Sequence, residues 1–497
     1  MDLIVATSSF LNSPGISSWG TARGETAHTA LGLAKGLRAL GHRTTLVAPL
    51  DAEIGESGLG LARRLSPLSV DVSGVSHERV VFDARLPSGV ELVLLGGEVP
   101  AEAADPHEAS RRWAWFGHAI AALARHRLGL VRAQGESELE AVVAVGEGAG
   151  FSALAIREDA KIPARDGGPS PRLLAGLARV AIPIDPAHDH RLPREALAAI
   201  GVSPELFTPE GIEFYGEASL VKSAAIAADR VVTLGESARY ALTAPGAPHR
   251  LDGVYRARAA EIVSIGSGVD MAQYNPATDP HLVARFDADD TNGKARGRSS
   301  LLAELELEHA ATLPLLAIIG RVDKSMEEGL VAALARALRG ELLVVIARPP
   351  ATEATELDAS IERLIRTHHG RIAIKSNANE AFLHRVLASA DFSLVLDSIS
   401  TSGTPARAAL RYGTIPIAPR TPGMEEAIVD VDASLTSGTG ILVANATSDE
   451  LFGGIQRAVS AFGNAAWPKL RRRAMRVEGG WERAARRLEA IIQQLEA

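Results

Sequence analysis

The chain has 497 residues, more than one hydrophobic core usually serves, so two domains of about 200–250 residues are expected. A formal net charge of −8 argues against a general nucleic-acid or anionic-membrane partner. The absence of cysteine excludes disulfides, thiolate metal sites and cysteine nucleophiles.

Short apolar runs alternate with longer amphipathic runs from the N-terminus onward. Strands are predicted at 3–9, 43–50, 90–97, 230–235, 261–269, 313–322, 341–349, 371–376, 392–397, 414–419 and 440–444, with helices between them, among them 30–42 and 110–128. Near-continuous apolar strands separated by helices indicate parallel sheets covered on both faces. No basic leader precedes the first strand and no stretch reaches the roughly 18 apolar residues of a membrane helix, so we expect a cytoplasmic protein.

Two segments bear on how the chain is divided. Residues 259–276 restart the strand-and-turn pattern, which places the domain joint near residue 260. Residues 286–300, FDADDTNGKARGRSS, are polar, charged and glycine-containing, and we expect a surface loop there. The histidines are scattered, so we expect neither a metal site nor a cofactor.

Long stretches of the sequence resemble the bacterial glycogen synthases and plant starch synthases. The stretches are LFTPEGIEFYGEASLVKSAAIAADRVVTLGES (206–237), the segment 266–298, ALRYGTIPIAPRTPGMEEAIVD (409–430), and TGILVANATSDELFGGIQRAV (439–459) followed by WERAARRLEAII (481–492). The resemblance implies the α/β GT-B fold, in which two Rossmann-like, doubly wound domains face a cleft. It implies an acceptor-side domain at 1–260, joined by the C-terminal helix 480–497, and a nucleotide-sugar-side domain at 261–479.

The same resemblance implies a chemistry. The family transfers glucose from ADP-glucose to the non-reducing end of an α-1,4-glucan with retention of configuration. Fixed positive charge and backbone N–H groups must stabilise the leaving diphosphate. A carboxylate must hold the sugar hydroxyls in a reactive pose, and water must be excluded.

The family's first diphosphate loop, Lys-Thr-Gly-Gly, falls on residues 22–25, Ala-Arg-Gly-Glu. The lysine is absent, so Arg23 and Gly24 become the candidates for nucleotide-sugar binding. Glu25 stands where the diphosphate would approach, and its charge would repel phosphate unless it turned outward. The alternative is a solvated loop in which Glu25 favours the positive end of a helix dipole.

The acceptor-facing motifs of the family are also altered. We expect its His-Ala-His-Asp-Trp-like run at the end of a strand near residue 132, where VRAQGESELE (131–140) holds no histidine or tryptophan. The family's His-Asn pair falls on Ile184 and Asp185. His188 and His190 lie nearby, and we expect both in a surface loop.

In the second domain, AIIGRVDKSMEEG (317–329) resembles the family's strand followed by an arginine and a lysine that hold the diphosphate. Arg321 matches directly, and Lys324 is the nearest candidate for the lysine. Both are candidate catalytic residues through diphosphate stabilisation. The alternative is that Arg321 pairs at the surface with Asp323 or Glu327.

The segment 400–416, STSGTPARAALRYGTIP, departs from the family at its sugar-binding carboxylate. Ser400 replaces the family glutamate and cannot supply its negative charge. Pro405 lies in the first turn of a helix, where it is tolerated, but it removes one N–H that could donate to phosphate. The remaining candidates for nucleotide-sugar binding are Gly403, Thr404, Thr421 and Gly423.

Two interpretations follow. In the leading one, this glycogen-synthase-like protein has lost, or nearly lost, glucosyl transfer and acts by binding α-glucan or by pairing with an active synthase partner. In the alternative, it is an active retaining glucosyltransferase with a rebuilt site that uses ADP-glucose or another nucleotide sugar. Neither involves nucleic acid or a membrane.

Overall fold

The structure is a computed structural model of the chain, and it describes residues 1–10, 21–50, 59–97, 105–134, 139–161, 174–320, 322, 324–348, 356–397 and 401–496. These residues fall into two compact units. The first unit contains residues 1–10, 26–266 and 481–496, and the second contains 21–25 and 267–480, in each case without the gaps given above.

The first unit is built on one mixed sheet, in which nine described strands follow the order β14-β13-β9-β8-β1-β2-β7-β6-β3. They are β1 (Asp2–Thr7), β2 (Arg43–Pro49), β3 (Ala62–Arg63), β6 (Val81–Arg85), β7 (Glu91–Leu95), β8 (Leu139–Val145), β9 (Ala178–Ile182), β13 (Arg230–Thr233) and β14 (Ile262–Ser264). The strands from β14 to β7 pair in parallel, and β6 and β3 continue the sheet antiparallel. β1 is buried at every position because helices cover both faces of the sheet.

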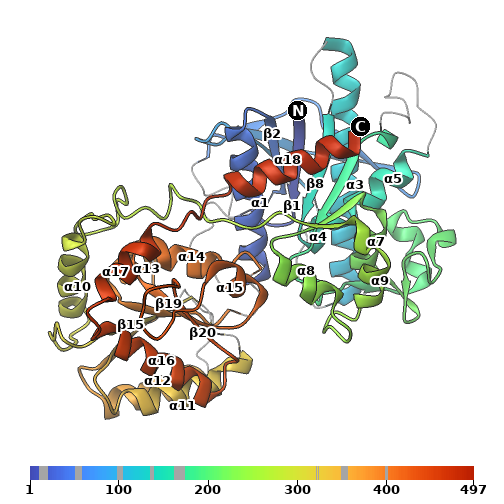
Figure 1. Cartoon of the computed structure of the whole chain (residues 1–497). Coiled ribbons are helices and arrows are strands. Elements are labelled where there is room, and N and C mark those ends of the chain that lie inside the picture. Colours follow the sequence, from blue (N-terminus) through green and yellow to red (C-terminus); the bar gives the residue numbers. More distant parts are fainter. Residues whose placement is uncertain are drawn as a thin grey trace. The chain divides into compact units, whose positions relative to one another are not determined.

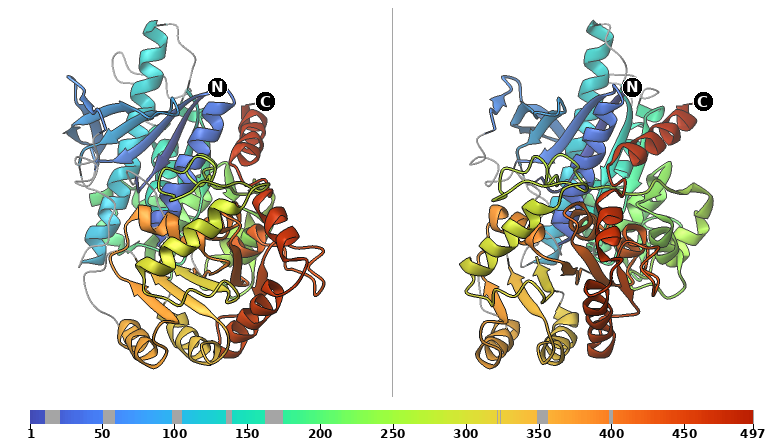
Figure 2. Two further views of the ribbon diagram at one scale, coloured as in Figure 1. Left: turned by 90° about the vertical axis from the view of Figure 1, so that its left-hand side faces the viewer. Right: turned by 60° about the vertical axis from the view of Figure 1, so that its left-hand side comes forward.

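Alternate residues of β1 belong to different cores. Ile4 and Ala6 pack with α3 (Pro106–Gln134), α5 (Ser152–Asp159) and α7 (Leu220–Ala227), whereas Leu3 and Val5 pack with α1 (Ala22–Ala39) and α18 (Glu482–Glu496). Figures 1 and 2 show α1 and α18 beside each other over the sheet. Further elements of this unit are α4 (Glu147–Gly150), α8 (Glu236–Thr243), α9 (Asp252–Ala257), β4 (Leu68–Val72), β5 (Val75–Arg79), β10 (Arg191–Leu192), β11 (Glu213–Phe214) and β12 (Glu217–Ser219).

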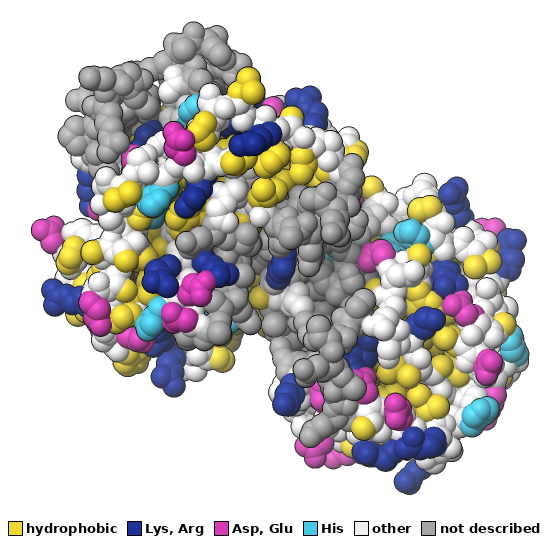
Figure 3. All heavy atoms as spheres, turned by 180° about the vertical axis from the view of Figure 1, so that it is seen from behind, with side chains coloured by type: hydrophobic (Ala, Val, Ile, Leu, Met, Phe, Trp, Pro, Cys, Tyr) yellow, Lys and Arg dark blue, Asp and Glu magenta, His cyan; other side chains and the backbone are white. Residues whose placement is uncertain are grey.

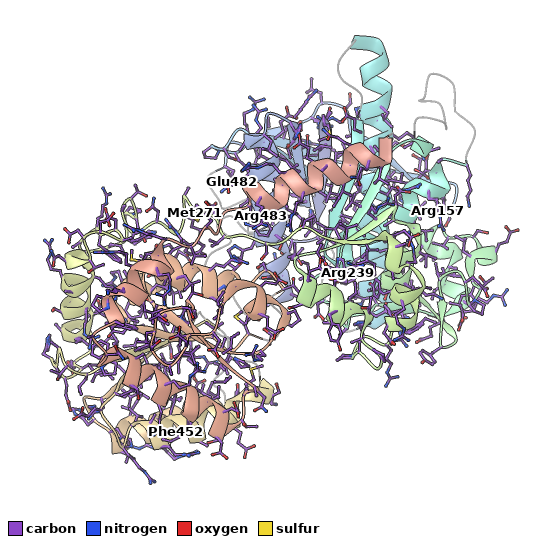
Figure 4. The ribbon with its side chains drawn as sticks, viewed as in Figure 1. Arg157, Arg239, Met271, Phe452, Glu482 and Arg483 are labelled. Carbon is purple, nitrogen blue, oxygen red and sulfur yellow. The ribbon has the colours of Figure 1, made fainter. Side chains whose placement is uncertain are left out.

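The approach of α18 to α1 depends on glycine. A Cβ atom at Gly32 would lie 2.1 Å from Nε1 of Trp481, and one at Gly36 would lie 2.9 Å from Cβ of Ala485. Glu482 and Arg483, which are labelled in Figure 4, begin the exposed face of α18. The final helix therefore packs into a groove that two glycines of α1 open, and its residues Glu482, Arg483, Arg486 and Arg487 are exposed.

The described strands of the second unit form a six-stranded parallel sheet in the order β17-β16-β15-β18-β19-β20. They are β15 (Leu315–Ile319), β16 (Leu343–Ala347), β17 (Ile372–Lys375), β18 (Phe392–Leu394), β19 (Ile415–Pro419) and β20 (Ile441–Val443). The helices are α10 (Asn292–Glu304), α11 (Glu327–Ala337), α12 (Glu356–Thr367), α13 (Glu380–Ser389), α14 (Thr404–Arg411), α15 (Pro422–Ala427), α16 (Ser448–Phe462) and α17 (Trp467–Met475). Short 3-10 helices are η2 (Arg194–Ala196), η3 (Ala198–Ile200), η4 (Pro204–Leu206) and η5 (Ala259–Glu261) in the first unit and η6 (Lys324–Met326) in the second.

The prediction of a surface loop at 286–300 is wrong for the second half of that segment, which forms the start of α10. Lys294 is buried there, and its Nζ donates hydrogen bonds to the carbonyl oxygens of Ala388 and Tyr412 at 3.1 and 3.0 Å and to Oγ1 of Thr414 at 2.9 Å. These carbonyls stand near the C-terminal ends of α13 and α14, which favour a positive charge, whereas burial lowers the pKa of Lys294 well below its ordinary value. Lys294, which the sequence places in a solvent-exposed loop, is thus a buried residue that links α10 to the ends of α13 and α14 by hydrogen bonds.

On the face shown in Figure 3, basic and acidic side chains of the described residues are interspersed. Neither positive nor negative charge dominates that face. Among the described helices, none is long and apolar enough to cross a membrane.

Candidate functional site

The sheet of the second unit reverses its order between β15 and β18, since β16 and β17 continue on one side and β19 and β20 on the other. In open α/β sheets, ligands bind beyond the carboxyl ends of the strands at such a switch point. β15 leads toward Arg321 and β18 toward Ser400, but both of these residues lie outside the described part of the chain. Lys324 is described, and it is an exposed residue that begins η6 after β15.

Gly403 positions the N-terminus of α14 beyond β18. Its φ of 66° lies in the left-handed region, and a Cβ atom there would approach the carbonyl oxygen of Gly423 to 2.3 Å. Glycine is therefore required both for the turn and for the contact with α15. Two of the predicted residues, Gly403 and Gly423, are thus brought together at the carboxyl ends of β18 and β19.

The hydroxyl groups at this helix start bond to one another. Thr404 is buried, its Oγ1 lies 2.6 Å from Oγ of Ser402, and its N–H donates to the same Oγ at 3.2 Å. Pro405 follows and has no N–H to donate. Thr421 precedes α15, and its half-buried side chain is close to the same edge of the sheet.

Glu25 occupies the backbone donors in front of α14. Its Oε1 accepts hydrogen bonds from the N–H groups of Thr401 and Ser402 at 3.1 and 2.6 Å and from the Thr401 hydroxyl at 3.3 Å. Only 6% of Glu25 is exposed, so the expectation that this residue is solvated is wrong, although Glu25 does lie in the first turn of α1 as that interpretation expected. A carboxylate of the chain itself is bound where backbone N–H groups and a helix N-terminus favour an anion.

Arg23 and Gly24, the other candidates of this loop, lie in the first turn of α1. Gly24 donates its N–H to Oγ1 of Thr21 at 3.0 Å, which caps the start of α1. Arg23 is exposed. Glu25, which sequence reasoning regarded as an obstacle, is therefore the residue of this loop that contacts Thr401 and Ser402.

Arg407 holds the opposite side of the same loop and was missed by sequence reasoning. It donates to the carbonyl oxygen of Ser402 at 3.0 Å, to Oγ of Ser267 at 3.0 Å and to the carbonyl oxygen of Glu426 at 2.9 Å. Burial lowers the pKa of Arg407 to about 10, so the guanidinium stays charged at neutral pH. The signal in the sequence was an arginine one turn after Gly403, on the helix that begins the site.

In the first unit, the strand end expected near residue 132 is wrong. Residues 106–134 form α3, because the amphipathic pattern of this helix continues through residue 132, and the strand is β8, which ends at Val145. Gly146 follows with a φ of 78°, and a Cβ there would approach the Thr26 side chain to 2.8 Å. The segment at the carboxyl end of this strand is therefore 146–150, Gly-Glu-Gly-Ala-Gly.

Glu147 joins this segment to the loop after β9. Its Oε1 accepts hydrogen bonds from the N–H groups of Ile184 and Asp185, each at 2.9 Å. Burial, with the negative charge of Asp185 adding to it, raises the pKa of Glu147 to about 7, despite the N–H donors that lower it. Near neutral pH this buried carboxyl group can therefore hold or release a proton.

The histidines beyond β9 do not share one environment. His188 is exposed, as expected, but His190 is half-buried, and its ring packs edge-on against Trp113 with centroids 4.1 Å apart. Burial, together with the charge of His188, lowers the pKa of His190 to about 4, so its ring is neutral at pH 7. The described residues contain no group of three or more His, Cys, Asp or Glu side chains arranged to hold a metal ion.

Comparisons with known proteins identify relatives along most of the chain. A glycogen synthase of Anaeromyxobacter sp. (strain Fw109-5) is 30% identical over 328 residues, which cover 65% of this chain and 68% of the relative. A glycogen synthase of Anaeromyxobacter dehalogenans (strain 2CP-1) is 30% identical over 323 residues, with 65% and 67% covered. No protein-family model matches the chain.

Solved structures share the fold. The catalytic domain of starch synthase IV from Arabidopsis thaliana, bound to ADP and acarbose, matches with a TM-score of 0.83 at 18% identity, covering 100% of this chain and 99% of that one. Sucrose-phosphate synthase from Thermosynechococcus elongatus matches with a TM-score of 0.58 at 15% identity and covers 100% and 99%. The GT-B fold expected from the sequence is thereby confirmed.

Proposed function

Because the chain belongs to the glycogen synthase family, we propose that it is a retaining glucosyltransferase that moves glucose from ADP-glucose or another nucleotide sugar to an α-1,4-glucan. The observation that carries this proposal is the 30% identity to glycogen synthases over about two thirds of their length. The solved starch synthase domain with ADP and acarbose supports binding of a nucleotide and a glucan. Nothing in these comparisons speaks for a loss of activity, so they favour transfer over the impaired protein of our leading interpretation.

In this proposal the diphosphate lies against the start of α14, whose N-terminal N–H groups favour an anion. Arg321 and Lys324 supply positive charge to it, and Arg407 holds the Ser402 carbonyl so that the loop keeps its shape. Arg23 and Gly24 complete the nucleotide-sugar side together with Thr404 and Thr421.

The contacts of Glu25 favour a second candidate function. Its carboxylate already bonds to the N–H groups of Thr401 and Ser402, and a diphosphate would have to displace it or bind beside it. Together with Ser400 in place of a glutamate, this arrangement supports a protein with strongly reduced or lost transfer. Such a protein would bind α-glucan or regulate an active synthase partner.

One experiment separates the two functions. The purified protein is incubated with glycogen and labelled ADP-glucose or UDP-glucose, and label in the polymer is counted for the native chain and for Glu25→Gln. A turnover of about 1 s⁻¹ or more, the low end for ordinary enzymes, supports transfer. Absence of label in both proteins, with glycogen still bound in a sedimentation assay, supports the second function.

The Glu25→Gln variant adds a direct test of the loop. The glutamine oxygen can still accept the two N–H bonds, but the negative charge is gone, so ADP should bind more tightly. Removing one negative charge that competes with the diphosphate should raise the affinity for ADP about tenfold. If calorimetry gives equal ADP affinities for the native chain and Glu25→Gln, Glu25 does not compete with the diphosphate.

A further inference from the structure

A cavity of about 650 Å³ lies in the first unit, between α3 and the edge of the sheet formed by β2, β7, β6 and β3. This volume is within the range of small-molecule sites. Its apolar side is formed by residues such as Val93 and Leu123. Its polar side is unusual, because four arginines line it.

The cavity is at the opposite end of the strands from Gly146 and Glu147. Arg43 is the first residue of β2 and Glu91 is the first residue of β7, so the lining residues lie near the amino ends of these parallel strands. Gly146 and Glu147 follow the carboxyl end of β8. A strand of seven residues such as β2 spans about 20 Å, so a ligand in the cavity would not share these residues.

Two of the arginines build the wall. Arg64 forms a bidentate pair with Asp83, with both N–O distances at 2.7 Å. Arg127 is largely buried, lies 3.0 Å from Oδ1 of the fully buried Asp2 and donates to the hydroxyl of Thr45. These contacts hold the side chains of Arg64 and Arg127 in the wall of the cavity.

The other two arginines are arranged differently. Arg43 and Arg85 approach the same carboxylate, Glu91, at 3.4 and 3.7 Å, and they keep 40% and 69% of their side-chain surface exposed. Arg127 approaches the same carboxylate at 3.5 Å, so Glu91 serves three guanidinium groups, each at a distance longer than a good hydrogen bond. A guanidinium group carries five N–H donors, and the largely exposed Arg85 can direct some of them to a further acceptor.

The charges of the cavity do not cancel. Four arginines face the three carboxylates Asp2, Asp83 and Glu91, so the described groups carry an excess of one positive charge. Burial raises the pKa of Asp2, while the charges of Arg127 and Arg43 act to lower it. His126, also in the lining, adds a ring whose pKa is lowered by burial and by the neighbouring Arg64.

We propose that this cavity binds a small phosphate monoester that carries hydroxyl groups, such as a sugar phosphate. Arg43 and Arg85 bind the phosphate, because guanidinium groups match its oxygens in a planar, bidentate geometry. Glu91, between them, accepts a hydroxyl of the ligand. Val93 and Leu123 contact the apolar face of the ligand.

The test is a calorimetric titration of the native chain with glucose 1-phosphate, inorganic phosphate and uncharged glucose, at saturating ADP so that the candidate nucleotide site is filled. Arg43→Gln and Arg85→Gln each remove one guanidinium. Arg63→Gln is the matched control, because Arg63 is exposed on β3 next to Arg64 but does not line the cavity. Thermal unfolding of each variant checks that it folds.

We expect saturable binding of glucose 1-phosphate, weaker binding of inorganic phosphate and none of glucose. Arg85→Gln and Arg43→Gln should each weaken the binding at least about tenfold, and Arg63→Gln should leave it unchanged. Absence of saturable binding to the native chain overturns the proposal, as does equal affinity in Arg85→Gln. Binding of glucose 1-phosphate that occurs only when ADP is omitted would place it in the nucleotide site and also overturn the proposal, whatever the transfer assay shows.

Discussion

Replacing Glu147 by glutamine should change how the stability of the protein depends on pH. In the native chain the carboxyl group is buried at the carboxyl end of β8, and its pKa is about 7 against an ordinary value of 4.5. Glutamine keeps the shape and an oxygen that can accept the N–H bonds of Ile184 and Asp185. It removes only the titration.

The sign follows from the direction of the shift. A carboxyl whose pKa is raised on folding contributes stability below its unfolded pKa, and this contribution is lost as the pH rises through the folded pKa. A shift from 4.5 to about 7 corresponds to about 3 kcal/mol in total. Between pH 5.5 and pH 8 about 2 kcal/mol of this is lost, and Glu147→Gln lacks that loss.

The assay is urea unfolding of the native chain and Glu147→Gln at several pH values between 5 and 8. Other titrating groups are common to both proteins and cancel in the difference of their unfolding free energies. We expect the unfolding free energy of Glu147→Gln relative to that of the native chain to rise by about 2 kcal/mol between pH 5.5 and pH 8. A difference that stays constant with pH would refute the assignment of a pKa near 7 to this carboxyl group.

The remaining predictions concern packing and buried charge. Lys294→Met should lower the unfolding free energy by at least about 3 kcal/mol in urea titrations, because several carbonyl acceptors lose their donor; a loss below 1 kcal/mol would contradict this. Although burial favours the neutral ring, hydrogen bonds to carboxylates, Asp279 first, raise the pKa of His384 to about 9. That stabilisation is complete below pH 6.5 and is lost as the pH rises through 9, so Asp279→Asn should be more destabilising at pH 6 than at pH 10. Gly32→Ala should lower Tm, because its Cβ would lie 2.1 Å from an indole nitrogen, whereas Gly253→Ala, with nothing within 4 Å, should not.

The sequence by itself determined the architecture. Apolar runs of strand length separated by amphipathic helices indicate doubly wound parallel sheets, because only a strand covered on both faces is apolar at consecutive positions. Family resemblance then gave the GT-B fold and located the altered positions, such as Ser400 and Pro405. The same resemblance singled out Gly403, whose left-handed φ of 66° only the structure showed.

Only the tertiary structure showed which partners the buried polar groups contact. Glu25 and Ser402 are 377 positions apart, so no local pattern shows that the carboxylate of one accepts the N–H of the other. The same holds for Lys294, which looks like a solvent residue until helix ends more than 90 positions away surround it. The family resemblance placed a strand end near residue 132, whereas that residue lies inside α3, which extends to Gln134. Hydrogen-bond partners, burial and the resulting pKa shifts depend on contacts distant in the chain, and the folded structure alone supplies these.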